Sequence, residues 1–400
     1  MPKYMQRIST VVIGGGASGI IAAISSRRRD REVIICERMP CLGRKILATG
    51  GGKCNLSNED LKESHYNPDA RQFVKSIFER FGKQHINNFF SGLGLRLYSE
   101  GGRIFPITNQ SSSVLKVLEE ELKRLSIAVE FNFDVRDILE TGKGFVAKSR
   151  EGKAITCDSI IIAGGGRTYP SLGSNGGCYG LASKLGHHII EPVPSTVPLA
   201  AKDKFCHLLQ GQRISCAAKS IIDGKIKKEA EGEILFTKHG LSGTAILDIS
   251  EDVSIAINRH NKKHIVVSID LVPFMTLDEL KEEIQARLAR GFKKEDLMLG
   301  ILPNKLRLVF RELFKDMGVD KIADILKDKR FDIIGTRGWN EAEFTSGGVD
   351  INEVKQGTLE SRLKKGIYFA GEVLDVDGER GGYNLAWAWA SGFVAGLMRT

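Results

Sequence analysis

Residues 8–26 read ISTVVIGGGASGIIAAISS, and this stretch decides the fold. The β-branched run Ile8–Ile13 predicts a strand, and Ile20–Ser26 predicts a helix. The turn between them has the pattern G-x-G-x-x-G, which in a strand–turn–helix context is typical of dinucleotide-binding proteins. The helix N-terminus offers free N–H groups and a positive dipole end to the phosphates. The stretch therefore predicts an α/β fold that opens with a dinucleotide-binding unit.

Each glycine of the motif has its own task. Gly14 permits the tight turn, Gly16 lets a pyrophosphate approach the backbone, and Gly19 allows the helix to pack closely on the strand. A second apolar run, Glu32–Cys36, predicts the next strand and leads into Glu37. Because an acidic side chain at this spacing accepts hydrogen bonds from both ribose hydroxyls, Glu37 favours an adenosine-diphosphate group with a free 2′-hydroxyl.

A second glycine-rich stretch, ATGGGKCN at Ala48–Asn55, resembles a truncated phosphate-binding loop. A Walker A loop would need glycine at Leu47 and a hydroxyl at Cys54, so the triphosphate interpretation fails at both positions. The loop instead offers many unhindered N–H groups and follows Arg44 and Lys45. We expect it to wrap the pyrophosphate and ribityl portion of FAD, a length of cofactor that NAD lacks.

Cysteine spacing raises one alternative. Cys36 and Cys41 have the separation of a flavoprotein redox disulfide, but Cys36 is expected inside the second strand. Seven cysteines, an odd number in a large chain, favour reduced thiols over a disulfide framework. The redox pair therefore stays the weaker interpretation.

Length and charge bound the class of protein. A chain of 400 residues predicts two or more domains, each with its own core. No signal peptide is visible at the N-terminus, so the cytoplasm is the expected compartment. No membrane span is expected, because the longest apolar run, Asn384–Met398, is shorter than roughly 20 residues, and it predicts a buried terminal helix. The net charge of +9 suits an anionic partner but is also common without one.

Two later segments support FAD. The strand expected at Ser159–Ala163 runs into Gly164–Gly166, and ligands of doubly wound folds bind at such strand ends. A second strand, Ile367–Ala370, precedes a loop and a helix from about Tyr383. Gly381 and its neighbour at the start of that helix can direct N–H donors at the flavin edge that becomes anionic on reduction.

Taken in order, these motifs resemble those of a family of bacterial FAD-dependent oxidoreductases. The family includes bile-acid dehydro-reductases, aminoacetone oxidases and ribosomal-RNA dihydrouridine synthases. The motifs that carry the resemblance span nearly the whole chain: Gly14–Gly19, ATGGGKCN, GRIFP (Gly102–Pro106), IIAGGG, GEILFT (Gly232–Thr237), TSGGV (Thr345–Val349), GEVLD and GGYN (Gly381–Asn384).

The resemblance implies an α/β architecture with a glutathione-reductase-like, doubly wound FAD-binding domain that is interrupted by an inserted β-barrel and a helical unit. The expected boundaries are 1–194 and 345–400 for the FAD-binding domain, 195–274 and 331–344 for the barrel, and 275–330 for the helical subdomain. Short strand-like runs in 195–274, a capping box at Thr276 and Glu279, and helical spacing over Leu277–Leu326 agree with it. No second G-x-G-x-x-G is present, which leaves NAD(P)H as a candidate external electron donor.

The expected FAD contacts come from several of these motifs and from positions near them. They are Gly14, Gly16, Ala17, Ser18, Gly19, Glu37, Arg38, Arg44, Lys45, Thr49, Gly50, Gly51, Gly52, Cys54, Asn55, Val135, Ala163, Gly164, Gly165, Thr168, Gly371, Glu372, Asp375, Gly381, Gly382, Tyr383, Asn384 and Leu385. No metal site is expected.

The catalytic candidates are Cys54, which follows the glycine loop, and His239. A thiol beside the flavin can act as an acid, although Cys54 equally suits a small buried filler. The family's histidine lies one position earlier, where this chain has Lys238, and the family has proline at the position of Thr244. Tyr169 and Tyr383 are secondary candidates.

Three substrates are open: a uridine of large-subunit ribosomal RNA reduced to dihydrouridine, a steroid-like enone, and an aminoacetone-like amine. Basic clusters favour RNA, at Lys225–Lys228, Arg259–His264, Lys293–Lys294 and Lys305–Arg311. Acidic residues interleave with them, as on an ordinary solvated face. A noncatalytic FAD- or RNA-binding module is the alternative from another class. The oligomeric state is not predicted.

Overall fold

The computed structural model describes residues 8–398 and divides them into two compact units. Unit 1 runs to Pro192 and resumes at Phe344, and unit 2 is Val193–Glu343. Each unit has a separate hydrophobic core. The chain therefore leaves unit 1 once and returns to complete it.

A seven-stranded mixed sheet forms the centre of unit 1, with the order β6-β2-β1-β9-β8-β7 and β18 beside β9. The first strand agrees with the sequence prediction, and the second begins one residue later than predicted. The strands are β1 (Ile8–Ile13), β2 (Val33–Glu37), β6 (Ala128–Phe131), β7 (Val135–Thr141), β8 (Gly144–Ser149), β9 (Ala154–Ile162) and β18 (Ile367–Phe369).

Five of these strands, β6, β2, β1, β9 and β18, run parallel and end at one edge. Ile13 of β1 lies opposite both Cys36 of β2 and Ile162 of β9, and Phe369 of β18 also lies opposite Ile162. The residues that follow these strands therefore meet at their shared carboxyl edge, which is where doubly wound sheets bind ligands.

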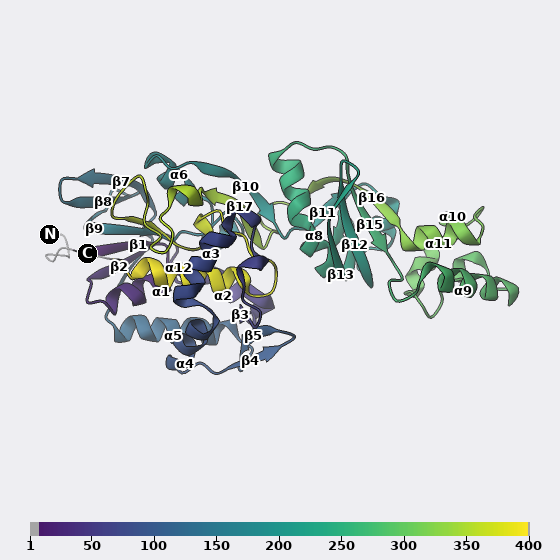
Figure 1. Cartoon of the computed structure of the whole chain (residues 1–400), viewed down its shortest axis with the longest axis horizontal. Helices are drawn as coiled ribbons and strands as arrows, with labels where there is room; N and C mark the ends of the chain where they lie inside the picture. Colours follow the sequence, from purple (N-terminus) through teal and green to yellow (C-terminus); the bar gives the residue numbers. More distant parts are fainter. Residues whose placement is uncertain (1–7, 399–400) are drawn as a thin grey trace. The chain divides into compact units, whose positions relative to one another are not determined.

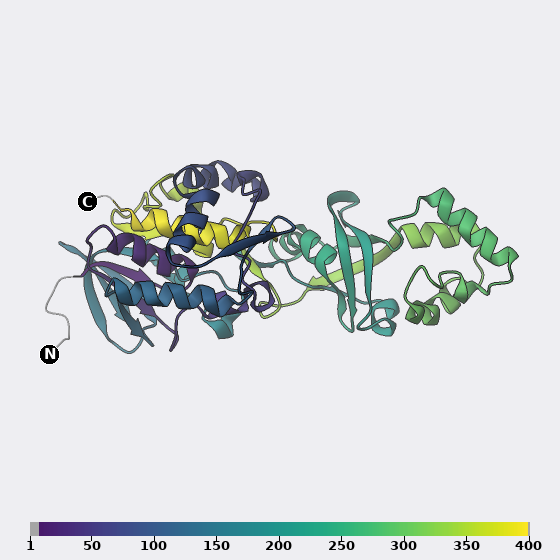
Figure 2. The same cartoon turned by 90° about the horizontal axis from the view of Figure 1, so that it is seen from below.

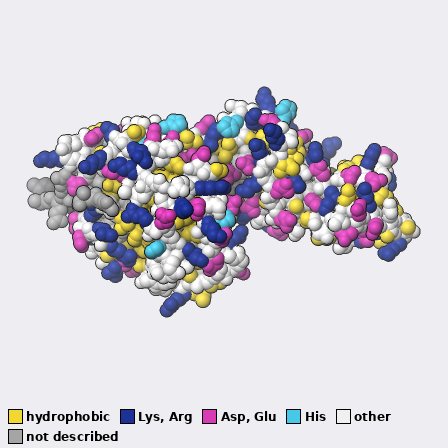
Figure 3. All heavy atoms as spheres, viewed as in Figure 1, with side chains coloured by type: hydrophobic (Ala, Val, Ile, Leu, Met, Phe, Trp, Pro, Cys, Tyr) yellow, Lys and Arg dark blue, Asp and Glu magenta, His cyan; other side chains and the backbone are white. Residues whose placement is uncertain are grey.

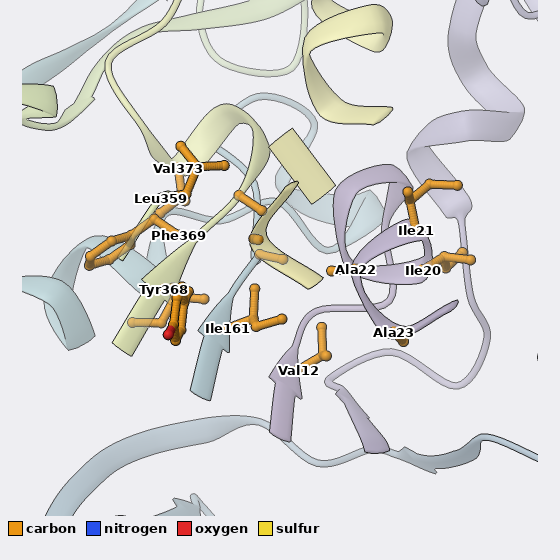
Figure 4. Close-up of a cluster of buried hydrophobic side chains, with 14 of the residues drawn as sticks. Val12, Ile20, Ile21, Ala22, Ala23, Ile161, Leu359, Tyr368, Phe369 and Val373 are labelled. Carbon is orange, nitrogen blue, oxygen red and sulfur yellow. The ribbon is translucent and has the colours of Figure 1, made fainter. Parts of the chain in front are cut away.

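The sheet buries one face against α1 (Ala17–Arg27) and α12 (Tyr383–Gly396). Figure 4 shows Val12 and Ile161 on neighbouring strands, with Ala22 and Ala23 of α1 on the nearer side of the helix. The two helices lie side by side in Figures 1 and 2, and Gly392 makes this possible, because a Cβ there would lie 2.3 Å from the Ser18 carbonyl oxygen. The strands of the sheet and these two helices therefore contribute to one hydrophobic core.

Smaller elements complete unit 1. The terminal helix α12 is buried, as predicted, and no helix within residues 8–398 is long and apolar enough to cross a membrane. The other elements are α2 (Arg44–Ala48), α3 (Arg71–Phe81), α4 (Lys83–Gly92), α5 (Ser111–Arg124), α6 (Gly177–Lys184), a sheet of β3 (Ser57–Asn58), β5 (Arg103–Pro106) and β4 (Leu97–Glu100), and the pair β10 (Ile189–Ser195) and β17 (Phe344–Val349). Strand β10 begins in unit 1, and its last three residues belong to unit 2.

Unit 2 contains a closed six-stranded barrel in the order β11-β14-β13-β12-β15-β16. Its interior includes Phe205, Phe236 and Phe331, whose ring centroids are 5.7–6.2 Å apart. The strands are β11 (Leu199–Ala201), β12 (Arg213–Ile222), β13 (Lys225–Thr237), β14 (Gly240–Ser242), β15 (Ile265–Asp270) and β16 (Lys329–Thr336). The inserted barrel that the resemblance implied is confirmed.

Three details of unit 2 differ from the sequence prediction. The runs in 195–274 are not all short strands, since β12 and β13 have 10 and 13 residues. The same segment also holds two helices, α7 (Lys204–Leu208) and α8 (Thr244–Ser254). The helical pattern after the barrel is broken by turns into α9 (Leu277–Ala289), α10 (Arg307–Leu313) and α11 (Val319–Lys327), and the predicted Thr276–Glu279 capping box is present.

Candidate FAD site

The first glycine motif lies at the carboxyl edge of the parallel strands. Gly14 has a φ of 107°, and a Cβ there would lie 2.6 Å from the Ala163 carbonyl oxygen. A Cβ on Gly19 would lie 1.9 Å from the Gly14 carbonyl oxygen, whereas one on Gly16 would meet nothing within 4 Å. Gly14 and Gly19 thus serve packing, and the backbone at Gly16 is open to an approaching ligand.

Glu37 follows β2 at the same edge and is buried. Its carboxylate accepts hydrogen bonds from the N–H groups of Gly15, at 2.6 Å, and Met39, at 2.7 Å. Burial raises the pKa of the Glu37 carboxyl, against the opposing effect of these two donors. Backbone N–H groups of the glycine turn and of Met39 therefore hold the Glu37 carboxylate in place beside the expected ribose site.

The stretch ATGGGKCN is more structured than a loop. Ala48 ends α2, so Arg44 and Lys45 lie in a helix, and Thr49–Gly52 forms a 3-10 turn. The backbone then has positive φ at Gly50–Gly52 and at Cys54, at 61° for the cysteine. A Cβ at Gly51 or Gly52 would meet nothing within 4 Å, which leaves this backbone open on one side.

A partly buried polar network joins three of the motifs. Lys45 Nζ lies 2.6 Å from both Glu372 Oε2 and Thr168 Oγ1. The other carboxylate oxygen of Glu372 accepts from the Thr345 N–H at 2.9 Å. The network fixes the strand ends relative to α2. Sequence reasoning did not assign Thr345 to the site, although the TSGGV motif marked its position.

The N-terminus of α12 lies against the segment that follows the glycine loop. Gly382 has a φ of 101°, and a Cβ there would lie 2.4 Å from the Ser57 carbonyl oxygen and 2.7 Å from Asn55 Oδ1. No side chain caps this helix. The amide of Asn384 instead closes the preceding turn through the Gly378 backbone. The first N–H groups of α12 are therefore available to an acceptor.

The remaining predicted contacts lie in unit 1 around the same strand ends. Ser18 Oγ donates to the Ala370 carbonyl, Arg38 donates to the Gly173 carbonyl at 3.2 Å, and the Asp375 N–H donates to Val349. The others follow or begin nearby elements: Ala17, Thr49, Val135, Ala163, Gly164, Gly165, Gly371, Gly381, Tyr383 and Leu385.

These residues fit a long dinucleotide. Within residues 8–398, side-chain oxygens of Asn55, Ser57 and Ser174 are buried without a hydrogen-bond partner. Such atoms require a partner from outside the chain, such as a ligand or water. The backbone at Gly16 and Gly51 is also open, so a ligand can approach it closely. Gly16 and the start of α1 would hold the pyrophosphate, Glu37 the ribose, and the start of α12 the flavin ring.

The predicted catalytic residues lie in different units. Cys54, in unit 1, is fully buried, and burial raises the pKa of its thiol to about 12, against a smaller opposing effect of the Thr49 hydroxyl. All seven cysteines are free thiols, and Cys36 lies in β2, so the redox-pair alternative gains no support. His239 lies in the exposed turn between β13 and β14 of unit 2, where none of the predicted FAD contacts is found.

Sequence reasoning also missed His65, which stacks on the Tyr383 ring at a centroid distance of 4.4 Å. Its two ring nitrogens lie 2.8 Å from Glu379 Oε2 and 3.1 Å from Asp60 Oδ2. Burial acts to lower the pKa of His65, but the two carboxylates outweigh it and the pKa is raised. The His65 imidazole therefore joins the residues that follow β3 to the turn that precedes α12, and its protonated form is favoured by both carboxylates.

This arrangement predicts a pH-dependent stability. Because the pKa of His65 is raised in the folded state, its interactions with the two carboxylates add to the free energy of unfolding. This stabilisation is complete below about pH 6 and is lost as the pH rises through the folded pKa. Glu379→Gln should lower the melting temperature most at the acidic end of this range and progressively less above it. Thermal melts across pH test this. Glu79→Gln, at an exposed position of α3, is the matched control. A pH-independent loss in Glu379→Gln would contradict the assignment.

Comparison with known proteins settles the family. The family model described as HI0933-like protein Rossmann domain matches residues 8–398. The chain belongs to the HI0933-like family. The resemblance drawn from the motifs is thereby confirmed, and with it the doubly wound fold. The HI0933-like chain is an FAD-dependent oxidoreductase.

Three curated relatives align over nearly their whole lengths. The chain is 35% identical over 407 residues to the 3-dehydro-bile acid delta(4,6)-reductase of Clostridium scindens, covering 98% of each protein. It is 29% identical over 402 residues to the ribosomal RNA dihydrouridine synthase of Escherichia coli, covering 98% of this chain and 97% of the relative. It is 28% identical over 414 residues to the protein of that name from Haemophilus influenzae, covering 99% of each.

Proposed function

We propose that this HI0933-like protein reduces a C=C bond conjugated to a carbonyl group, and that the bond belongs to a uridine of large-subunit ribosomal RNA. Two relatives named ribosomal RNA dihydrouridine synthase, aligned over at least 97% of each protein, carry this proposal. The net charge of +9 supports a polyanionic substrate over a small one.

The reaction adds a hydride at C6 and a proton at C5 of the base; bound FAD, once reduced by the electron donor, would supply the hydride and be left oxidised. The base must leave its stack to react. Cys54 and Tyr383 both keep their proton at neutral pH, because burial raises the pKa of each to about 12, and for Tyr383 the Glu379 and Asp60 carboxylates add to the effect. We propose them as proton sources in unit 1, with His239 as the candidate from unit 2.

A second candidate is reduction of a steroid-like enone. The 35% identity to a bile-acid reductase favours it, because this relative has the highest identity of the three. Both candidates need the same chemistry from unit 1, since uridine and an enone each present a C=C bond conjugated to a carbonyl. They differ in the size and charge of what must be bound.

The test uses ribosomal RNA from a strain that lacks the gene. FAD-loaded protein with NAD(P)H, our proposed electron donor, or with dithionite, should introduce dihydrouridine that mass spectrometry of RNA fragments detects. RNA that stays unmodified while a conjugated steroid enone is reduced would replace the RNA proposal by the second candidate. Hydrogen peroxide formed from aminoacetone, without reduction of either compound, would contradict C=C reduction altogether.

A further inference from the structure

One end of the unit 2 barrel brings two basic segments together. β12 and β13 are joined by a tight turn in which Asp223 and Gly224 have φ of 49° and 78°. Asp–Gly suits such a hairpin turn, because both central residues need positive φ. The Asp223 N–H donates to the His264 carbonyl at 3.0 Å, and Ile222 pairs with Ile265 at the start of β15. The turn of the hairpin and the loop 259–264 are therefore neighbours.

We call the charged residues of these two segments the hairpin-end patch. It has six lysine and arginine side chains, two histidines and one carboxylate. Most of the basic side chains are exposed. Figure 3 shows Lys, Arg and His side chains close together over part of the barrel. The members are Asp223, Lys225, Lys227, Lys228, Arg259, His260, Lys262, Lys263 and His264.

Half of the six lysine and arginine side chains of the patch have no ion-pair partner among the described residues. Lys262 pairs with Asp223 at 2.8 Å and lowers the pKa of that carboxyl. Among the described residues, Lys225, Lys227 and Lys263 form no ion pair. Elsewhere in unit 2, Arg213 pairs with Glu233 at 3.0 Å, but exposed cations such as Lys293, Arg311 and Lys321 also form no ion pair with the described residues. The patch is distinguished by the clustering of its charges, because six cations and a single carboxylate lie on two adjoining segments.

We propose that the hairpin-end patch is a docking surface for the phosphate backbone of RNA, an inference that rests on the proposed function. Clustered lysines neutralise phosphates and release counterions, which gives affinity without reading sequence. Ile226, which is 54% exposed at the tip of the hairpin, adds an apolar contact beside the cations. Strand pairing and the hydrogen bond from Asp223 to His264 hold the backbones of the hairpin and the loop side by side.

The test compares two triple variants of the full-length holoprotein. The patch variant is Lys225→Gln with Lys227→Gln and Lys263→Gln. The control removes the same charge from exposed positions of unit 1, with Lys148→Gln, Lys153→Gln and Lys365→Gln. Both should retain FAD absorbance and the wild-type melting temperature. Binding to a fluorescent large-subunit rRNA fragment is measured over a series of salt concentrations.

The patch variant should bind the fragment at least about tenfold more weakly, and its salt dependence should be shallower by roughly 0.7–0.9 for each phosphate that is no longer neutralised, while the control stays near wild type. Equal weakening in both variants, or none in either, overturns the inference. The inference is also overturned if the patch variant binds vesicles of an anionic phospholipid more weakly than wild type but binds the RNA fragment equally well. If RNA binding depends on the patch but no dihydrouridine forms, the docking surface is supported and the proposed reaction is refuted. If the patch variant modifies the RNA as well as wild type does, the proposed reaction is supported and the docking surface is refuted.

Discussion

Replacing Gly16 by valine is expected to leave the ligand-free protein folded and to weaken FAD binding by at least roughly a hundredfold, or about 2.7 kcal/mol. In the structure Gly16 has extended backbone angles, φ −87° and ψ −168°, which valine adopts without strain. A Cβ there meets nothing within 4 Å, so the packing of the fold is unchanged. The added methyl groups would instead occupy the space through which a pyrophosphate approaches the start of α1.

Gly19→Val is the matched comparison in the same motif. Its Cβ would lie 1.9 Å from the Gly14 carbonyl oxygen, and this backbone contact cannot yield cheaply. Overpacking of this kind costs about 1–3 kcal/mol or more, so this variant should melt earlier with or without FAD. Thermal melts of both apoproteins, followed by fluorescence titration with FAD, separate the two effects. If Gly16→Val binds FAD as tightly as wild type, the pyrophosphate does not bind at this turn.

Local patterns in the sequence account for the parts of the fold that were predicted well. Ile8–Ile13 has the β-branched composition of a buried parallel strand, and its bounds follow directly. The capping box at Thr276 is a contact between residues three apart, so it too is visible in the sequence. Both features depend on neighbours along the chain.

The features that were missed depend on the barrel or on distant contacts. β13 reads KIKKEAEGEILFT, and most of its length faces solvent, so it lacks the apolar alternation that marks a strand. Helix α8 does carry apolar residues at helical spacing, at Ile246, Ile249 and Val253, but it lies within an otherwise strand-rich segment. The prediction of short strands over 195–274 therefore did not distinguish this helix from its neighbours.

Contacts in the candidate site were the least predictable. His65 and Glu379 are 314 positions apart, and Lys45 and Glu372 are 327 apart. No periodicity connects such residues, because the return of the chain into unit 1 creates the contact. The motifs indicated which loops surround the site, whereas the hydrogen bonds that hold those loops needed the structure.

Glu37→Gln is expected to raise the dissociation constant for FAD by about tenfold to a hundredfold, because hydrogen bonds to a charged group contribute roughly 1.5–3 kcal/mol. Glutamine preserves the volume but replaces one carboxylate oxygen by an NH₂ group. Since the N–H groups of Gly15 and Met39 each point at a different oxygen, at 2.6 and 2.7 Å, one donor would face another donor. The ribose would then compete for the single oxygen that remains.

Fluorescence titration of the apoprotein with FAD measures this effect. Glu32→Gln is the control, because Glu32 lies just before β2, its side chain is 52% exposed and its ion pair with Arg27 is at the surface. If Glu37→Gln leaves the dissociation constant for FAD unchanged, the carboxylate stabilises the glycine turn and does not contribute to FAD binding. Weaker binding at an unchanged melting temperature would instead assign it to the cofactor, since only the bound state would then sense the removed charge.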